Sequence, residues 1–202
     1  MIRQTVQALA ACAVTFVICS VVYPLAVWGL GWALFPRQAE GSLVYGPDNR
    51  TVIGSELIAQ PFASEKYFHP RPSAVDYKAD AAGGSNLGPK NPDLHAKVKE
   101  RVEALKATDA NPAPVDLISA SGSGLDPHIS PEAAYFQAPR VASARGMTVE
   151  HVRGLVDRLT ERSGAMIGAP SRVNVLMLNL ALDAAKSAPG SPLAGIREDV
   201  DQ

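Results

Sequence analysis

The chain opens with a long apolar run, Thr5 to Phe35, that contains no Asp, Glu, Lys or Arg. About 20 apolar residues in a helix cross the hydrocarbon core of a bilayer. The run is therefore long enough to span a membrane once. Its aromatic residues Tyr23, Trp28 and Trp32 lie near the far end, where they suit the boundary between membrane and water.

Two processed forms of this run compete with a retained helix. A cleaved secretory signal needs a shorter apolar segment and a small-x-small cleavage site. The residues at the end of the run, Trp32 to Arg37, contain no such site. The stretch Leu9 to Cys12 looks like a lipid-attachment box, but too little apolar sequence precedes it. We therefore expect a retained helix, which tolerates Pro24 when neighbouring groups satisfy the freed carbonyl.

The charges flanking the run are one on each side, Arg3 and Arg37. A short N-terminal tail usually stays in the cytoplasm, and long domains are exported largely regardless of charge. We expect residues after about 40 to lie outside the cytoplasm. Cys12 and Cys19 are the only cysteines and both lie in the run, so the outer domain has no disulfide and depends on its core.

Charge gives little information about partners. All Asp and Glu residues, and all Lys and Arg except Arg3 and Arg37, lie after residue 38, so the outer domain is near neutral. Nucleic-acid binding is disfavoured, because a phosphate-binding surface needs a basic excess. We expect three parts: a short cytoplasmic tail and transmembrane helix (1–38), an outer domain (39–187) and a flexible tail (188–202).

The outer domain begins with a predicted hairpin. Leu43 to Tyr45 and Thr51 to Ile58 have the alternation of short strands, and Gly46 to Asn49 is a strong turn signal. Residues 61–92 follow, so rich in Pro, Gly, Ser and Asn that little regular structure is expected. A long irregular segment in a compact domain is usually functional or disordered, and its aromatic residues favour order.

Helix signals dominate the rest of the chain. Each predicted helix starts at a capping residue, and two of them have Pro at the first helical position: the caps are Asn91, Ser130 and Thr148. We expect Pro139 to interrupt the second helix and Gly146 to end it, and Gly164 to end the third. Val115 to Ser119 has the pattern of a buried strand. Leu176 to Leu182 alternates like a strand, but its second half favours a helix.

The segment Ser119 to Pro131 is the most distinctive in composition. It has neither the lysine of a phosphate-binding loop nor the Gly-x-Ser-x-Gly elbow of hydrolases. Ser123, Asp126 and His128 carry the groups of a hydrolytic triad, yet nearness in sequence says little about triad geometry. A turn followed by a capped helix accounts for these residues better.

Ligand chemistry is otherwise sparse. The four histidines lack the spacing of metal ligands, and Asp76 and Asp80 lie in a Gly-rich neighbourhood that does not favour a carboxylate pair. The residues alone indicate a single N-terminal transmembrane helix followed by a mixed α/β (α+β) extracytoplasmic domain with long irregular segments. This profile favours a subunit over an enzyme.

Several long segments together resemble one family. They occur in order behind the single span: Tyr67 to Ala74, Gly83 to Pro89, Val115 to Pro131, and Arg172 to Leu176. Over nearly the whole chain up to about Asp183, the sequence resembles the C subunit of the bacterial Kdp potassium-transporting ATPase. The resemblance implies a place in the bacterial inner membrane, with a channel-like potassium-binding subunit and a P-type ATPase subunit as partners.

The resemblance also implies an accessory role. The family is described as a catalytic chaperone that raises the ATP affinity of the ATPase subunit and as an assembly factor, so the chain needs no cofactor of its own, and ATP and K⁺ are handled by the complex. We expect the Pro/Gly-rich segment Tyr67 to Pro89 and the turn Gly122 to His128 to contact the channel-like subunit, near its outer ion entrance. The candidate contact residues are Tyr67, Phe68, His69, Asn86, Leu87, Ser123, Asp126 and His128.

Two other classes remain open from the residues. A pilin-like filament subunit also begins with an apolar helix, although this N-terminus has neither a Gly-Phe processing site nor an acidic residue in the helix. A membrane-anchored hydrolase would require Ser123, Asp126 and His128 to converge.

Overall fold

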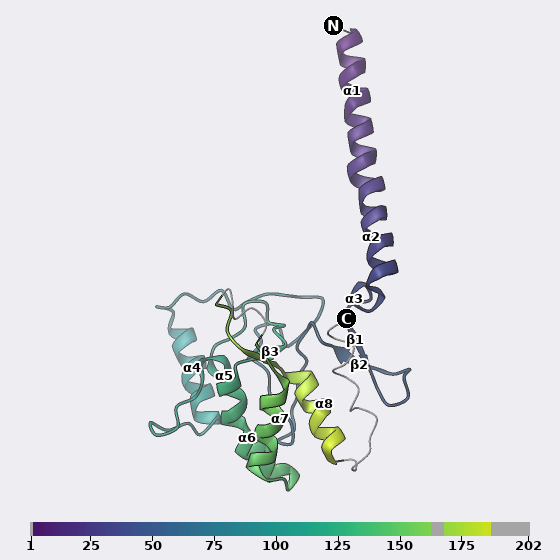
Figure 1. Ribbon diagram of the computed structural model, residues 1–202. Coiled ribbons are helices and arrows are strands. Elements are labelled where there is room, and N and C mark those ends of the chain that lie inside the picture. The colour runs from purple at the N-terminus through teal and green to yellow at the C-terminus, as the bar shows by residue number, and fades with distance from the viewer. Residues whose placement is uncertain (1, 163–167, 187–202) are drawn as a thin grey trace. The chain divides into compact units, whose positions relative to one another are not determined.

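The structure is a computed structural model that describes residues 2–162 and 168–186. The chain divides into two compact units, one ending at Ile53 and the other beginning at Gly54. A long apolar helix comes first and a domain of mixed helices and strands follows, as the sequence predicts (Figure 1).

The first unit is built on a continuous helix formed by α1 (Ile2–Val17), the π-helical turn η1 (Ile18–Val22) and α2 (Tyr23–Leu34). It is long and apolar enough to cross a membrane. In the π turn the Tyr23 N–H donates to the Ile18 carbonyl, five residues back. Pro24 follows directly, and since proline lacks an N–H and crowds the preceding turn, it accounts for this local widening.

A short connection and a hairpin follow the long helix along the chain. Helix α3 (Pro36–Ala39) leads to β1 (Leu43–Tyr45), which pairs with β2 (Val52–Ser55) in a two-stranded sheet. The Asp48 carboxylate accepts from the backbone N–H groups of Arg50 and Thr51 and from the Thr51 hydroxyl. The predicted hairpin is confirmed, although β2 ends at Ser55, where the serine hydroxyl accepts from the Leu57 N–H and turns the chain.

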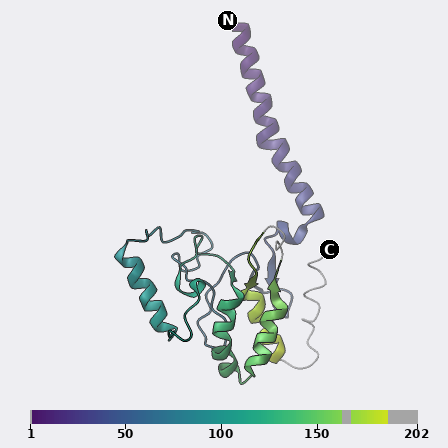
Figure 2. The ribbon, with the colours of Figure 1, turned by 60° about the vertical axis from the view of Figure 1, so that its left-hand side comes forward.

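The second unit is organised around three helices and a small sheet. Helix α7 (Val149–Leu159) packs against both α6 (Pro131–Arg145) and α8 (Val175–Lys186). Strands β3 (His128–Ile129), β4 (Thr160–Glu161) and β5 (Arg172–Asn174) form an antiparallel sheet in the order β3-β5-β4. This sheet contacts all three helices through β5, and both ribbon views show it at one end of them (Figure 2).

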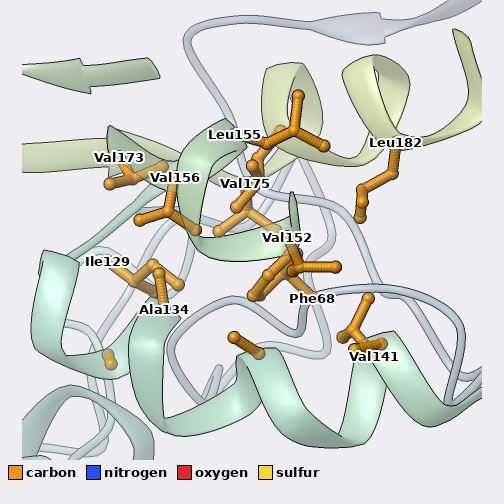
Figure 3. Packing of buried hydrophobic residues seen from close by; sticks show 14 of the residues in the cluster. Phe68, Ile129, Ala134, Val141, Val152, Leu155, Val156, Val173, Val175 and Leu182 are labelled. Carbon is orange, nitrogen blue, oxygen red and sulfur yellow. The ribbon is translucent and has the colours of Figure 1, made fainter. Parts of the chain in front are cut away.

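The core lies between these helices and the sheet (Figure 3). Phe68 is its largest member, with none of its surface exposed, and it packs beside Val141 and Val152. Alanines on α6 let α7 approach closely. The irregular segment that carries Phe68 is therefore part of the core and not an appendage.

The predicted helix starts are confirmed. The Asn91 side chain accepts from the Asp93 N–H at the start of α4 (Pro92–Ala104), and Ser130 and Thr148 cap α6 and α7 in the same way. Gly146 ends α6 with a left-handed backbone, φ +67°. Local capping chemistry therefore determines where these helices begin.

Two predictions about helices and strands are wrong. Val115 to Ser119 is not a strand, because Val115–Ile118 forms the short helix α5, in which only Leu117 is buried. Asp116 lies in its first turn, after Pro114, where an acidic residue favours helix. Pro139 does not interrupt α6, which continues to Arg145. Its exposed position leaves the unpaired carbonyl one turn earlier to water.

The last described element is wholly helical. Helix α8 begins at Val175, so all of the alternating leucines from Leu176 to Leu182 are helical. The sequence favours a helix only for the second half of this segment. The predicted stop at Gly164 and the predicted flexible tail 188–202 fall outside the described residues.

Candidate subunit-contact surface

The segment from Glu65 to His69 is held by side chains in place of a neighbouring strand. The Asn179 amide accepts from the Phe68 N–H at 2.8 Å and donates to the Phe68 carbonyl at 3.0 Å. The Gln137 amide makes the same pair of bonds with His69, at 2.8 and 3.1 Å. These two amide clamps, from α8 and α6, satisfy buried backbone groups that an irregular segment would otherwise leave unpaired.

Two arginines of α6 add to this support. Arg140 donates to the Tyr67 carbonyl at 3.0 Å and to Gln137 at 2.8 Å. Arg145, whose side chain is 3% exposed, forms an ion pair with Asp183 at 2.8 Å and lies over the Tyr67 ring. The segment is therefore rigid, because four side chains from two helices fix its backbone and its aromatic ring.

Local electrostatics follow from this packing. Desolvation and the Asp183 carboxylate raise the pKa of the Tyr67 hydroxyl. Desolvation, and after it the Arg140 guanidinium, lowers the pKa of the His69 imidazole. Both side chains are therefore held toward their neutral forms.

Parts of the two irregular segments predicted to form a contact surface, Tyr67 to Pro89 and Gly122 to His128, lie against each other. We call residues 72–89 and 119–128 the paired loops. The Ser121 N–H donates to the Pro72 carbonyl at 2.9 Å, and the Gly83 N–H donates to the Ser123 carbonyl at 2.7 Å. A Cβ at Gly84 would lie 2.9 Å from the Gly122 carbonyl oxygen, so the two backbones are in direct contact.

Gly124 is the tightest point of the paired loops. Its φ is +69°, and a Cβ there would lie 2.6 Å from Val75 and 2.8 Å from the Gly83 carbonyl oxygen. Only glycine fits such a position without strain. Asp76, Tyr77 and Asn86 also have positive φ. An ordered surface with strained backbone is a common property of functional segments.

The far end of the paired loops joins a charged network. Arg71 donates to Asp126 at 3.1 Å and its Nε lies 3.9 Å from Asp116. Asp126 accepts from the His128 N–H at 3.0 Å, and Asp116 accepts from the Ser130 N–H at 2.8 Å, at the start of α6. Burial alone raises the pKa of Asp126, but hydrogen bonds from His128 and Arg71 lower it to about 2.

This network borders an open pocket of about 430 Å³. Its wall includes Arg71, Asp116, Asp126, His128 and Arg172. Most of these charges already have partners, since Arg172 forms an ion pair with Glu161 at 2.9 Å. The network therefore fixes the shape of the loops around β3 and α6.

The triad hypothesis does not fit the geometry. The Ser123 hydroxyl lies 3.2 Å from the Ser121 hydroxyl and accepts from the Leu125 N–H, while the His128 Nδ1 lies 3.7 Å from Asp126. No hydrogen bond joins Ser123 to His128 in the described part of the chain. In this segment, Ser123 stabilises a turn.

The predicted contact residues fall into three groups. Asn86 and Ser123 are exposed on the paired loops, and Leu87, Asp126 and His128 are half-buried there. Tyr67 and His69 are half-buried on the clamped segment. Phe68 is fully buried, so the contact role expected for it does not fit its position, and it is a core residue.

Sequence reasoning missed the residues that support this surface. Asn179, Gln137, Arg140 and Arg145 lie on two helices, more than 65 positions from the segment that they bind. The one sequence signal that could have indicated these residues is a polar side chain on an otherwise apolar helix face, since a buried polar group needs a hydrogen-bonding partner.

Fold and surface together define a class: a domain on a single apolar helix long enough to cross a membrane, with an ordered irregular surface. The family model described as the K⁺-transporting ATPase c chain, KdpC, matches residues 5–184, so the chain belongs to this family.

Named relatives agree with the family match. The chain is 54% identical to the potassium-transporting ATPase KdpC subunit of Janthinobacterium sp. (strain Marseille), over 82% of this chain and 90% of that protein. It is 50% identical to the KdpC subunit of Rhodopseudomonas palustris (strain BisB5), over 91% and 98%. It is 52% identical to that of Methylococcus capsulatus, over 91% and 99%. The chain is therefore a subunit of a K⁺-transporting ATPase, and the pilin-like and hydrolase classes are set aside.

Proposed function

We propose that this chain is an accessory, non-hydrolysing subunit of a high-affinity potassium importer, where it assembles and stabilises the complex. The helix Ile2–Leu34 crosses the inner membrane once, with the N-terminus in the cytoplasm and the folded domain outside. The observation that carries the proposal is the paired loops, whose backbones are ordered against each other without regular structure. A preordered surface loses little conformational entropy on binding.

The partners are a channel-like potassium-binding subunit and a P-type ATPase subunit. We assign the paired loops to the contact with the channel-like subunit, near its outer ion entrance. Exposed Asn86 and Ser123, and half-buried Leu87 and His128 on the same loops, offer both polar and apolar contacts. Mixed contacts of this kind are typical of subunit interfaces.

The chain raises the ATP affinity of the ATPase subunit without touching ATP. ATP is cytoplasmic, whereas the folded domain lies outside in the proposed topology. Contacts that favour one conformation of the partners shift its population, and ligand affinity changes with it. ATP therefore belongs to the complex, and this chain acts through the coupling between sites.

Affinity purification from the native membrane tests the class. Cells grown at low K⁺ would supply the tagged chain in mild detergent, and mass spectrometry would identify what is retained with it. We expect a channel-like subunit and a P-type ATPase, with K⁺-stimulated ATP hydrolysis. Recovery of the chain alone or as a homopolymer would contradict the proposal.

Substitutions on the paired loops test the contact surface. Leu87→Ala and His128→Ala should weaken retention of the chain during purification and lower transport. The matched control is His151→Ala, on the exposed face of α7, which should have neither effect. Full retention and normal transport in both loop variants would show that the paired loops are not part of the subunit interface.

Topology is tested by labelling. A cysteine at exposed Arg153, in a chain with Cys12→Ser and Cys19→Ser, should react with an impermeant reagent added to cells whose outer membrane is permeabilised. Reaction only after the inner membrane is opened would place the domain in the cytoplasm and make direct ATP contact possible.

A further inference from the structure

The hairpin formed by β1 and β2 exposes apolar side chains. Tyr45, Val52 and Ile53 are 44%, 48% and 36% exposed. Leu43 and Val44 are only half-buried. A two-stranded ribbon is marginally stable in water by itself, and it needs an apolar surface to cover one face. The hairpin therefore lacks part of its packing within the described chain.

The connection to the span is short and hydrogen-bonded. After Leu34, the Glu40 N–H donates to the Pro36 carbonyl at 3.0 Å and the Ser42 N–H donates to the Arg37 carbonyl at 2.9 Å. Gly41 and Ser42 then turn the chain, with φ of +84° and +48°. With four residues in helix α3, the chain extends at most about 25 Å from Leu34 to β1. The hairpin is thus tethered close to the point where the span leaves the membrane.

The tip of the hairpin is polar and rigid. The Asp48 carboxylate holds the turn through its bonds to Arg50 and Thr51, and hydrogen bonds lower the pKa of Asp48 to about 2, so the turn keeps its charge near neutral pH. A tyrosine and aliphatic residues beside polar groups match the chemistry of the membrane interface, where apolar side chains enter and polar groups stay hydrated. The tether also gives the hairpin a high effective concentration at that interface.

We propose that residues 43–53 form a second membrane contact, in which Tyr45 and Val52 enter the boundary between headgroups and acyl chains of the leaflet where the span ends. These two residues lie opposite each other on one face of the hairpin, next to the bond from the Gly46 N–H to the Thr51 carbonyl. This inference rests on the proposed crossing of the membrane by Ile2–Leu34. The hairpin then restricts the tilt and rotation of the domain on its anchor. The hairpin contacts lipid in this proposal, and the experiment below distinguishes that contact from one with a partner subunit.

Fluorescence quenching in vesicles tests this contact with the full-length chain. The background has Cys12→Ser and Cys19→Ser, and a polarity-sensitive probe is attached to Val52→Cys. The vesicles contain phosphatidylethanolamine and phosphatidylglycerol, with or without brominated acyl chains. The matched control is Arg153→Cys, on the exposed face of α7. A probe at Trp28→Cys, in the middle of α2, reports on the span itself.

We expect brominated lipid to quench the Val52→Cys probe several-fold more than the Arg153→Cys probe, and aqueous iodide to do the reverse. Adding Tyr45→Asp, on the same face of the hairpin, should return the Val52→Cys probe to the behaviour of the control, with the circular dichroism of the domain unchanged. Equal iodide quenching at both sites would overturn the lipid contact. So would a Val52→Cys probe that is shielded only in the whole transporter and never quenched by lipid, which would assign the hairpin to a partner protein.

The Trp28→Cys probe separates the two proposals. If brominated lipid fails to quench it, the span does not cross the membrane and the proposed function fails. If lipid quenches Trp28→Cys and leaves Val52→Cys unaffected, the span is right and the hairpin contact is wrong.

Discussion

Replacing Asn179 by alanine removes one of the two amide clamps. Asn179 is 1% exposed, and both of its hydrogen bonds go to the backbone of Phe68, which is fully buried. The substitution leaves a buried N–H and a buried carbonyl without partners, at about 1–3 kcal/mol each. We therefore expect the free energy of unfolding to fall by about 2–6 kcal/mol, a large share of the roughly 5–15 kcal/mol typical of a domain.

Asn91→Ala is the matched control, because it removes an asparagine from a more exposed helix cap. Loss of a cap costs about 1 kcal/mol. For a domain of this size 1 kcal/mol lowers Tm by about 2–4 °C, so Asn179→Ala should lower Tm by roughly 4 to 24 °C and the control by a few degrees.

Circular dichroism of the full chain in detergent measures the difference, since Trp28 and Trp32 lie in the apolar helix and do not report on the domain. Hydrogen exchange of a peptide covering residues 65–71 should speed up in Asn179→Ala and not in Asn91→Ala. A decrease in Tm no larger than that of the control, with unchanged exchange at residues 65–71, would refute the argument that the amide replaces a neighbouring strand.

Other positions give sharper local tests. Gly124→Ala should destabilise the domain by about 1–3 kcal/mol, because its left-handed backbone and close approach to Val75 exclude a side chain, whereas Gly122→Ala meets open space and should have little effect in the same thermal assay. Asp126 has a folded pKa of about 2, below its unfolded value of 3.8, so its stabilisation is complete above the unfolded pKa and is lost as pH falls toward 2. Asp126→Asn should therefore lower Tm at pH 7, and the difference from the unmodified chain should shrink between pH 4 and pH 2. Ser123→Ala should not abolish K⁺-stimulated ATP hydrolysis of the complex, because Ser123 stabilises a turn and has no hydrogen bond to His128; complete loss in a complex that still assembles would reopen the hydrolase hypothesis for that loop.

Local signals in the sequence predicted the elements that are determined locally. The apolar run forms one continuous helix because no charged residue divides it and Pro24 only widens it locally into a π turn. Asn91, Ser130 and Thr148 begin helices because their side chains satisfy free N–H groups. The strand prediction for Val115 to Ser119 failed because the sequence of a four-residue helix with one buried leucine resembles that of a short strand. Strands β3, β4 and β5 have only two or three residues each, too few for an alternating pattern.

The side-chain packing at the candidate surface could not be predicted from the sequence, because it depends on long-range contacts. Aromatic residues in an irregular segment indicated order, but they did not reveal that Phe68 enters the core while Tyr67 lies against Arg145. That distinction depends on Asn179 and Gln137, whose roles appear only when α6 and α8 are packed. The close contact of the paired loops likewise depends on glycines in two segments that are separate in the sequence.

The amide clamps have a consequence for biogenesis. Phe68 and Asn179 are 111 positions apart, so Phe68 emerges from the ribosome long before its hydrogen-bonding partner exists. At about 5–20 residues per second, the delay is roughly 5 to 20 s. During this interval the apolar helix is already available for insertion, while the aromatic segment behind it is unfolded and prone to aggregation. We therefore expect the segment from Glu65 to His69 to stay unfolded until α8 has been synthesised.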